Sequence, residues 1–198
     1  MTKTDIFLIL LAGILRHTSG FTWAYNQKLY FEEKLENDNF MYYLMLSPVI
    51  SGVIGTTFGG ALTDYLRRGD KFSGIQGALL VLSLCHLVAS PLMVLVLTLN
   101  DPYCFVLLFI TVLFSEMWYG VYLVAVSELF QPQKRGSAIA YTIFILRIVA
   151  GNVPGLIVPY IRPILGYYWT LMLLVPGLYF SSSVVWGVML IRVKFSNH

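Results

Sequence analysis

Charged residues are scarce in this chain. Asp, Glu, Lys and Arg make up only 12% of its 198 residues, whereas about a quarter is usual in soluble domains. A soluble protein of this size keeps most of its residues near water, and so few charges leave such a surface uncovered. Hydrophobic residues, at 58%, take their place. The composition argues against a soluble enzyme, a nucleic-acid-binding protein or a disordered linker, and it indicates a polytopic membrane protein.

Cysteine is also rare, and the two cysteines form no motif. Cys85 and Cys104 lie in or beside apolar stretches, without the spacing of a metal site or of a disulfide framework. We interpret both as small side chains within the lipid phase. The sequence therefore predicts no bound metal ion and no cofactor.

Catalytic and channel motifs are missing as well. An intramembrane serine protease needs a G-x-S-x type of turn and a partner histidine. Ser19 has no glycine two residues before it, and His86 has no supporting motif. An ion channel with six spans would need a pore loop or a repeated basic helix, and the sequence contains neither. We therefore expect that the protein is not an enzyme.

Long apolar stretches dominate what is present. A bilayer core of about 30 Å is crossed by a helix of about 20 residues. Six stretches are long enough, at residues 6–25, 40–63, 74–97, 103–126, 137–161 and 167–191. Because lipid satisfies no backbone polar group, each stretch is expected to be helical. The predicted fold is all-α, a single bundle of six transmembrane helices over residues 1–198.

The basic residues predict the orientation of this bundle, because Lys and Arg concentrate in cytoplasmic loops. Eight fall on one side of the predicted spans: Lys3, Arg67, Arg68, Lys71, Lys134, Arg135, Arg192 and Lys194. Three fall on the other, namely Lys28, Lys34 and Arg162. The loop that holds the two lysines also carries the acids Glu32, Glu33, Glu36 and Asp38. Both termini are therefore predicted to be cytoplasmic.

One face of the second span consists of small residues. Ser47, Ser51, Gly55 and Gly59 recur every four residues. Such a stripe lets the backbone of a neighbouring membrane helix approach closely. We expect this span to pack tightly against a partner helix.

Ionisable residues lie near the middle of four spans, although a charge there costs about 3 kcal/mol on insertion scales. They are Arg16 and His17, His86, Glu116 and Arg147. At 1.5 Å per residue, all lie about 15 Å from the cytoplasmic face. Groups from four helices at one depth favour a polar cavity, which is where transporters bind their substrates. The alternative is a buried Arg–Glu pair that only holds the bundle together, and a lone His86 is more typical of packing.

Helical geometry adds neighbours to this site. Ser19, Trp23 and Asn26 share the helix face of Arg16, while Tyr119 lies on the face of Glu116 and Tyr122 beside it. Aromatic side chains with polar tips can stack on a ligand or donate hydrogen bonds to it. The predicted substrate-binding residues are Arg16, Ser19, Trp23, Asn26, Glu116, Tyr119 and Tyr122. His17 points about 100° away from Arg16 around the helix, so it is expected on a different wall.

The charges in this cavity indicate its substrate. Two arginines against one glutamate favour an anionic or zwitterionic solute, because arginine presents a fixed fork to carboxylate or phosphate. Burial disfavours the ionised form of Glu116, whereas a neighbouring arginine favours it. This opposition suits a carboxylate that takes up and releases a proton. Glu116 is therefore also the predicted coupling residue.

Two cytoplasmic joints resemble the signature of the major facilitator superfamily. Residues 60–64 (GALTD), followed by Arg67 and Arg68, are similar to its G-x-L-x-D start, with Tyr65 where a basic residue is usual. The stretch from Glu128 to Gly136 is similar to its E…P-x-x-R-G joint. The resemblance implies one half of a twelve-helix, alternating-access transporter. It also implies a conformational latch formed by Asp64, Arg67, Arg68, Glu128 and Arg135, against the alternative of solvated surface pairs.

Further stretches look most like the C-terminal half of spinster-like carriers and their organic-anion relatives. They are residues 12–13, 23–26, 116–118 and 151–154. This resemblance implies transport of small organic anions or lysolipids across the plasma membrane or an endolysosomal membrane. In the family the first and fourth helices line the cavity, so Arg147 on the fifth ranks below Arg16 and Glu116.

The length of the chain bears on its partners and its function. One six-helix half cannot enclose a substrate, so the partner is a second six-helix half or another copy of this chain. The chain is then either a fragment of a longer transporter or a protein of which two copies assemble. The alternative function is a half protein that transports nothing and acts as a membrane scaffold or regulator.

Overall fold

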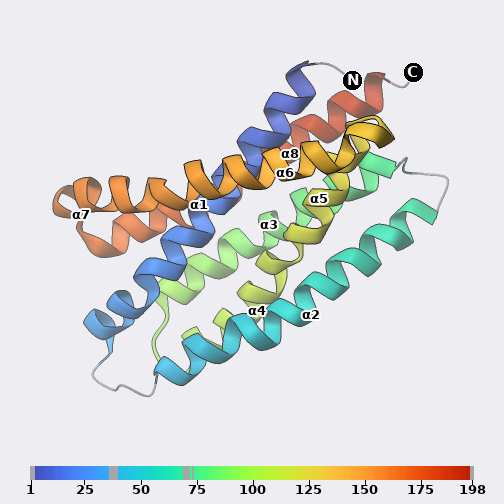
Figure 1. Cartoon of the computed structure of the whole chain (residues 1–198). Helices are drawn as coiled ribbons and strands as arrows, with labels where there is room; N and C mark the ends of the chain where they lie inside the picture. Colours follow the sequence, from blue (N-terminus) through green and yellow to red (C-terminus); the bar gives the residue numbers. More distant parts are fainter. Residues whose placement is uncertain (1–2, 36–39, 69–71, 73, 197–198) are drawn as a thin grey trace.

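The computed structural model describes residues 3–35, 40–68, 72 and 74–196. Glu36, Asp38 and Lys71, which the charge-based orientation uses, lie outside these residues. Within the described ranges the chain is all-helical and has no strand. The helices form an elongated bundle. The start of the first helix and the end of the last helix lie close together at one end of it (Figure 1).

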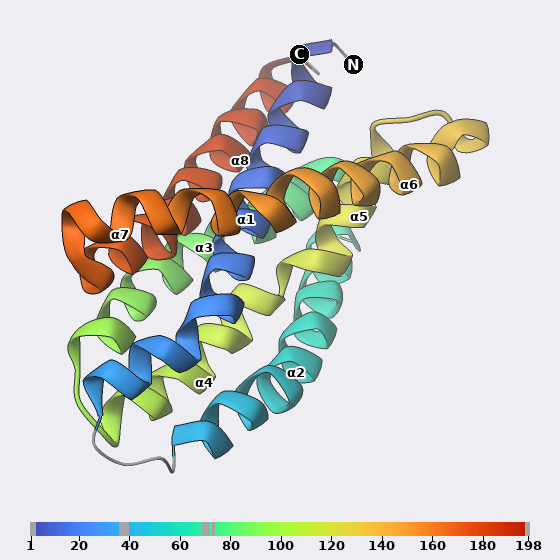
Figure 2. The ribbon, with the colours of Figure 1, turned by 60° about the vertical axis from the view of Figure 1, so that its left-hand side comes forward.

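The helices follow one another with short connections. The first three are α1 (Lys3–Lys34), α2 (Phe40–Arg68) and α3 (Gly74–Thr98). Next, α4 (Tyr103–Glu116) and α5 (Trp118–Glu128) form one stretch interrupted at Met117, whose N–H donates to the Phe114 carbonyl at 3.4 Å. A 3₁₀ turn, η1 (Pro132–Lys134), leads into α6 (Arg135–Ile145), a π-helical turn, η2 (Leu146–Ala150), and α7 (Gly151–Leu174). The last helix is α8 (Pro176–Ser196). The α6–α7 helix crosses α1 near its middle (Figure 2).

Five helical stretches of the described chain are long and apolar enough to cross a membrane. They are Lys3–Lys34, Phe40–Arg68, Gly74–Thr98, Tyr103–Glu128 and Pro132–Phe195. The sequence predicts six, because it separates the fifth and sixth spans at residues 162–166. The difference arises because helical structure continues through this joint, with only Gly166 outside the helical region at φ 77°. This positive φ suits glycine, and Figure 1 shows the chain turning back from α7 towards α8.

The small-residue stripe of α2 packs against α4 and its junction with α5. Ser47, Ser51, Gly55 and Gly59 are all buried. A Cβ atom on Gly55 would collide with the Leu113 carbonyl, and one on Gly59 with the Met117 carbonyl. The predicted close approach of a neighbouring backbone is confirmed, because only glycine leaves room for it at these two positions.

The hydrophobic core is divided into two clusters by a polar layer. On α1, for example, Ile9 and Ala12 belong to one cluster and Trp23 to the other. Buried polar side chains lie between the clusters on α1, α3, α4 and α8: Arg16, Ser19, His86, Ser115, Ser182 and Ser183. This layer lies where the sequence predicts ionisable groups from several helices at one depth.

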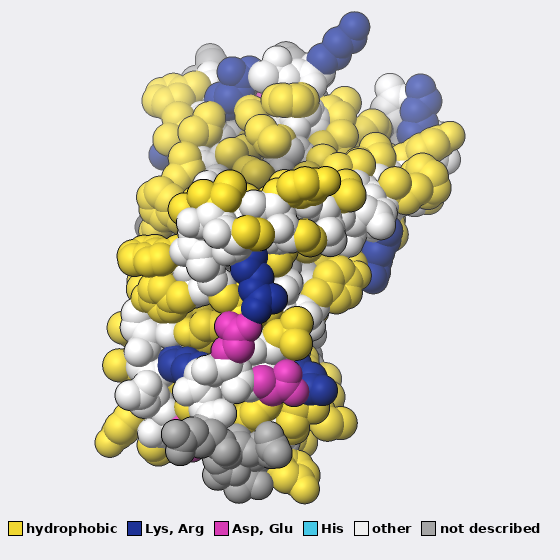
Figure 3. All heavy atoms as spheres, turned by 90° about the vertical axis from the view of Figure 1, so that its left-hand side faces the viewer, with side chains coloured by type: hydrophobic (Ala, Val, Ile, Leu, Met, Phe, Trp, Pro, Cys, Tyr) yellow, Lys and Arg dark blue, Asp and Glu magenta, His cyan; other side chains and the backbone are white. Residues whose placement is uncertain are grey.

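Large apolar side chains are exposed over much of the surface, above all on α2, α7 and α8. Figure 3 shows a face that is mostly hydrophobic, with a few groups of basic and acidic side chains. A water-soluble monomer rarely exposes such extensive apolar surface. Together with the five apolar stretches, this surface is compatible with an integral membrane protein.

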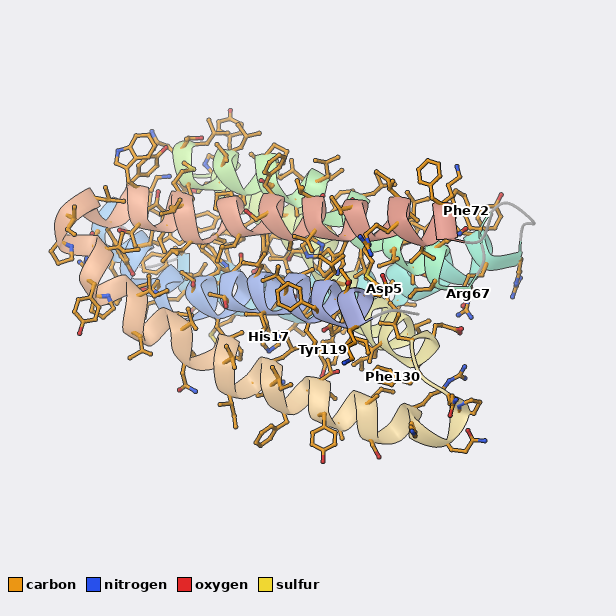
Figure 4. The ribbon with its side chains drawn as sticks, turned by 90° about the horizontal axis from the view of Figure 1, so that it is seen from above. Asp5, His17, Arg67, Phe72, Tyr119 and Phe130 are labelled. Carbon is orange, nitrogen blue, oxygen red and sulfur yellow. The ribbon has the colours of Figure 1, made fainter. Side chains whose placement is uncertain are left out.

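Ion pairs lie at both ends of the bundle. At the end that holds the termini, Arg67 Nη2 lies 2.9 Å from Glu128 Oε1 and Arg192 Nε lies 3.8 Å from Asp5 Oδ1 (Asp5 and Arg67 are labelled in Figure 4). At the opposite end, Arg162 pairs with Glu33. This grouping is what the charge-based orientation requires, and the assignment of the first end to the cytoplasm stays a prediction.

Candidate functional site

Arg16 is the most deeply buried cation of the polar layer, with only 2% of the residue exposed. Its Nη2 atom donates to the Ser115 carbonyl at 2.7 Å and to Glu116 Oε1 at 3.1 Å. The guanidinium carbon also lies 4.8 Å from the ring centre of Trp118 and 4.9 Å from that of Tyr179. One carboxylate, one carbonyl and two aromatic faces thus stabilise this charge in the interior.

Gly20 makes room for the Arg16 side chain. A Cβ atom on Gly20 would lie 2.6 Å from Arg16 Nη1, since the two residues are one helical turn apart on α1. The guanidinium therefore lies along its own helix and reaches the α4–α5 junction. Gly20 follows Arg16 by four residues in the sequence. This spacing places the glycine beside the guanidinium and explains how the side chain can lie along α1.

An open cavity of about 370 Å³ lies beside the Arg16–Glu116 pair. Its walls come from α1, α2, the α4–α5 junction and η2, with Thr56 from α2. The charged and aromatic residues that line it are Arg16, His17, Glu116, Trp118, Tyr119 and Arg147. His17 and Tyr119, which both line this cavity, are labelled in Figure 4.

A second cavity of about 180 Å³ adjoins the first. Both are lined by Gly20, Ala24 and Glu116. The second adds Trp23 and Gln27 of α1 and residues of α2, α3 and α4. The Glu116 carboxylate, with 38% of its side chain exposed, therefore borders both spaces.

Four of the seven predicted substrate-binding residues line these cavities. Arg16, Glu116 and Tyr119 line the first, and Trp23 and Glu116 line the second. The structure places the other three, Ser19, Asn26 and Tyr122, elsewhere. They belong to neither lining and are packed against other helices.

The hydroxyl of Ser19 stabilises the break between α7 and α8. Pro176 has no N–H with which to continue the helix, so α7 ends just before it and α8 begins at it. Ser19 Oγ donates to the Val175 carbonyl at 2.9 Å, and Ser90 Oγ donates to the Pro176 carbonyl at 2.9 Å. Ser19 therefore has a structural role at the junction of α7 and α8.

Asn26 and Tyr122 are likewise used for helix packing. The Tyr167 hydroxyl donates to the backbone carbonyl and to Oδ1 of Asn26, at 2.9 and 3.0 Å. The Tyr122 hydroxyl donates to the Ile9 carbonyl at 3.3 Å, and its ring fills the space beside Gly13. These contacts tie α1 to α7 and to α5 and leave neither side chain facing the cavities.

Two ionisable residues of the first cavity are missing from the predicted set. His17 is expected on another wall than Arg16, yet both line the first cavity, because its curved wall wraps around α1. Arg147 is ranked below the others as a residue of a peripheral helix. It nevertheless lines the cavity from η2, where α6–α7 crosses α1. Its depth, equal to that of Arg16 and Glu116, is the sequence feature that identifies it.

His86 has the environment of a packed core histidine. It is fully buried, its Nδ1 atom lies 3.0 Å from the Leu82 carbonyl, and its ring contacts those of Tyr179 and Trp186. His86 belongs to neither cavity lining. The packing interpretation made from the sequence agrees with this environment.

The predicted latch residues are only partly in contact. Arg67 pairs with Glu128, and both side chains lie against Gly74 at the start of α3. Arg135 Nε instead donates to the Phe130 carbonyl at 3.3 Å, next to the turn before α6. Asp64 and Arg68 are exposed and form no ion pair with another described residue. Of the possible partners of Glu128, the structure selects Arg67.

Reversing the charge of Arg67 is expected to destabilise the end of the bundle that holds the termini. The Arg67 and Glu128 side chains are 31% and 29% exposed, so the pair contributes about 1 kcal/mol. Arg67→Glu places two carboxylates together and lowers the midpoint of thermal unfolding. Arg67→Glu combined with Glu128→Arg is expected to restore it, and Arg68→Glu serves as the unpaired control. Failure of the double variant to recover stability would rule out this pairing.

Comparison of the chain with protein families, with curated proteins and with solved structures finds no match. The fold and the cavity define its class. Over the described residues it is an all-helical chain whose apolar stretches are long enough to span a membrane, and charged residues line its open cavity.

Proposed function

We propose that this chain is a six-span, half-transporter unit of the major facilitator type that carries a small anionic or zwitterionic solute or a lysolipid. In this proposal the Pro132–Phe195 stretch crosses the membrane twice, with its turn at Gly166. Both termini are cytoplasmic, and a second six-helix half or another copy of the chain completes the translocation path.

The observation that carries the proposal is the position of the Arg16–Glu116 pair. It borders an open cavity of about 370 Å³ and is not sealed within the bundle. Ionisable groups inside a membrane are costly, and they mark substrate or ion pathways when they line a water-accessible space. A pair that only held helices together would not need 38% of its carboxylate side chain exposed.

The charge of the cavity supports an anionic or zwitterionic substrate. Arg16, Arg147 and Glu116 line it, so one positive charge is left over when Glu116 is ionised. The aromatic rings of Trp118 and Tyr119 offer apolar surface beside these charges. A solute with an anionic group and an apolar body fits this combination.

Transport by the purified chain in liposomes tests the proposal. We expect uptake of a radiolabelled aromatic carboxylate or a fluorescent lysophosphatidic acid. Arg16→Met is expected to reduce the initial rate at least about tenfold, because Glu116 then cancels the charge of Arg147. Arg162→Met, at the opposite end of the bundle, is the matched control. Equal rates for liposomes with and without the chain, for both probes, would exclude a carrier.

The proposed role of Glu116 in coupling uptake to protons is tested by a separate measurement. Glu116→Gln keeps a hydrogen-bond acceptor for Arg16 but cannot exchange a proton in the cycle. We expect it to lose uptake driven by a pH gradient while it keeps exchange of substrate across the membrane without a gradient. Unchanged pH-driven uptake by Glu116→Gln would remove the coupling role of this residue.

A non-transporting scaffold or regulator is the second candidate, favoured by the direct Arg16–Glu116 contact, which can hold the helices together without any solute. It predicts that an aromatic carboxylate binds to the chain without crossing the membrane. Binding in detergent together with zero flux in liposomes would favour it over a carrier.

A further inference from the structure

The two arginines of the cavity have different environments. Arg16 is 2% exposed and already bound by Glu116, the Ser115 carbonyl and two aromatic rings. Arg147 is exposed, and its guanidinium contacts the Phe21 ring, with 5.8 Å between the guanidinium carbon and the ring centre. Within the part of the chain that the structure describes, no carboxylate is within ion-pair distance of Arg147. Arg147 is thus the cavity cation whose charge has no counterion in the described chain.

A continuous row of rings joins the two guanidinium groups. Arg16 lies on Trp118, the His17 ring centre is 5.5 Å from that of Trp118 and 4.8 Å from that of Phe21, and Arg147 lies on Phe21. His17, Phe21 and Trp118 all line the cavity. Its wall therefore has a neutralised cation at one end and an aromatic surface along its middle. At the other end lies a cation that pairs with no carboxylate of the described residues.

The backbone around Arg147 departs from regular helix. Residues 146–150 form the π-helical turn η2, and Gly151 follows directly. A Cβ atom on Gly151 would lie 3.5 Å from Phe21 Cε2, so this segment lies close against α1. Single π turns inside α-helices are frequent at functional sites. Here the turn lies where α6–α7 meets α1, and it carries Arg147 in the cavity wall.

We propose that Arg147 binds the anionic group of the ligand, and that Arg16 is a positioning residue that holds Glu116. This inference rests on the proposed function, because it takes the cavity to be the substrate site. The ligand is an amphiphilic anion, with a carboxylate or phosphate ester on Arg147 and an apolar body against Phe21 and Trp118. The single uncompensated charge of the cavity matches one anionic group.

Equilibrium dialysis with the full chain in phosphatidylcholine nanodiscs tests the proposal. The probes are radiolabelled 1-naphthoate and its neutral analogue 1-naphthalenemethanol, with empty nanodiscs as the blank. Arg147→Gln removes the charge, Arg147→Lys keeps it, and Arg162→Gln removes an arginine from the same long helix outside the cavity. Arg147 is exposed and makes no ion pair with a described residue, so these variants are expected to fold.

We expect Arg147→Gln to weaken naphthoate binding at least about tenfold, as for loss of a hydrogen bond to a charged group. Arg147→Lys should retain most of the affinity, and Arg162→Gln all of it. The neutral alcohol should bind equally to every variant. The proposal is overturned if the wild type binds no naphthoate, or if Arg147→Gln weakens both probes alike.

The inference and the proposed function can fail separately. Naphthoate binding that depends on Arg147, without flux in liposomes, keeps the binding site and removes the carrier. Flux that is lost in Arg16→Met and unchanged in Arg147→Gln keeps the carrier and overturns the role of Arg147.

The anionic group has two possible sources, a solute or a lipid headgroup. Nanodiscs that also contain phosphatidylglycerol separate them. Loss of naphthoate binding in these nanodiscs, with a lipid dependence that Arg147→Gln removes, assigns the site to a lipid headgroup. Unchanged binding assigns it to a solute, and both results support Arg147 as the anion-binding residue.

Discussion

Replacing Glu116 by leucine is expected to destabilise the fold by about 3 kcal/mol, because removal of one partner leaves a buried charge uncompensated. The charge concerned is that of Arg16, whose side chain is only 3% exposed. The Ser115 carbonyl and the rings of Trp118 and Tyr179 remain after the change, but none of them is an anion. In this variant a cation without its anion is buried in the middle of the bundle, between the two hydrophobic clusters.

Removal of the other partner of the pair, by Arg16→Met, is expected to destabilise the fold less. It leaves Glu116 without its cation, but 38% of this side chain is exposed in the cavity, so water can solvate the carboxylate. Methionine also fills much of the space of the arginine stem. Unfolding titrations with dodecyl sulfate in bicelles, followed by tryptophan fluorescence, measure both free energies. Equal losses, or a larger loss for Arg16→Met, would contradict the assignment of Arg16 as the buried partner.

The second large effect is expected at the contact between α2 and the α4–α5 junction. Gly59→Ala places a Cβ atom against the carbonyl of Met117 and within 2.9 Å of its Cα atom. Neither is the end of a flexible side chain, so the helices must separate. Overpacking of this kind costs about 1–3 kcal/mol. Because Met117 joins α4 to α5, we also expect the Arg16–Glu116 geometry to be disturbed.

Gly60→Ala is the matched control, one position further along the same helix. A Cβ atom there has no neighbour within 4 Å. Alanine is also the better helix former by up to about 1 kcal/mol, so stability should be unchanged or slightly higher. The same dodecyl sulfate titration compares the two variants. Similar stabilities for Gly59→Ala and Gly60→Ala would show that the close approach of α2 does not contribute to the fold.

Much of the fold follows from local sequence properties. Apolar stretches of spanning length predict the helices, because their backbone groups have no other partners in lipid. The four-residue repeat from Ser47 to Gly59 predicts a close helix contact, which the structure confirms against α4 and its junction with α5. The identity of that partner helix is not predictable from the stripe, since any backbone of suitable shape satisfies it. Similarly, the sequence divides residues 137–191 into two spans, whereas the helical structure continues to a single glycine with positive φ.

The sequence predicts how deep the site residues lie along their helices better than it predicts towards which neighbouring helix each side chain points. Counting residues from the helix ends places Arg16, Glu116 and Arg147 at one level, and the structure gathers all three around one cavity. Counting does not reveal which side of α1 faces that cavity. Ser19 and Asn26 share a helix face with Arg16 in the sequence, yet they bond to Val175 and Tyr167. A helix buried on several sides has several neighbours along one face, and each hydrogen-bonding side chain bonds to the polar group that lies within its reach.

The sequence by itself determined the helical class, the apolar surface and the presence of charged groups in mid-bundle, because these depend on composition and on spacing along one helix. The tertiary structure alone decided that Glu116 bonds to Arg16 and that, among the described residues, no carboxylate lies within ion-pair distance of Arg147 on η2. The physical reason is distance: a guanidinium is neutralised only by a carboxylate within a few ångströms, and the packing of one helix across another sets that separation.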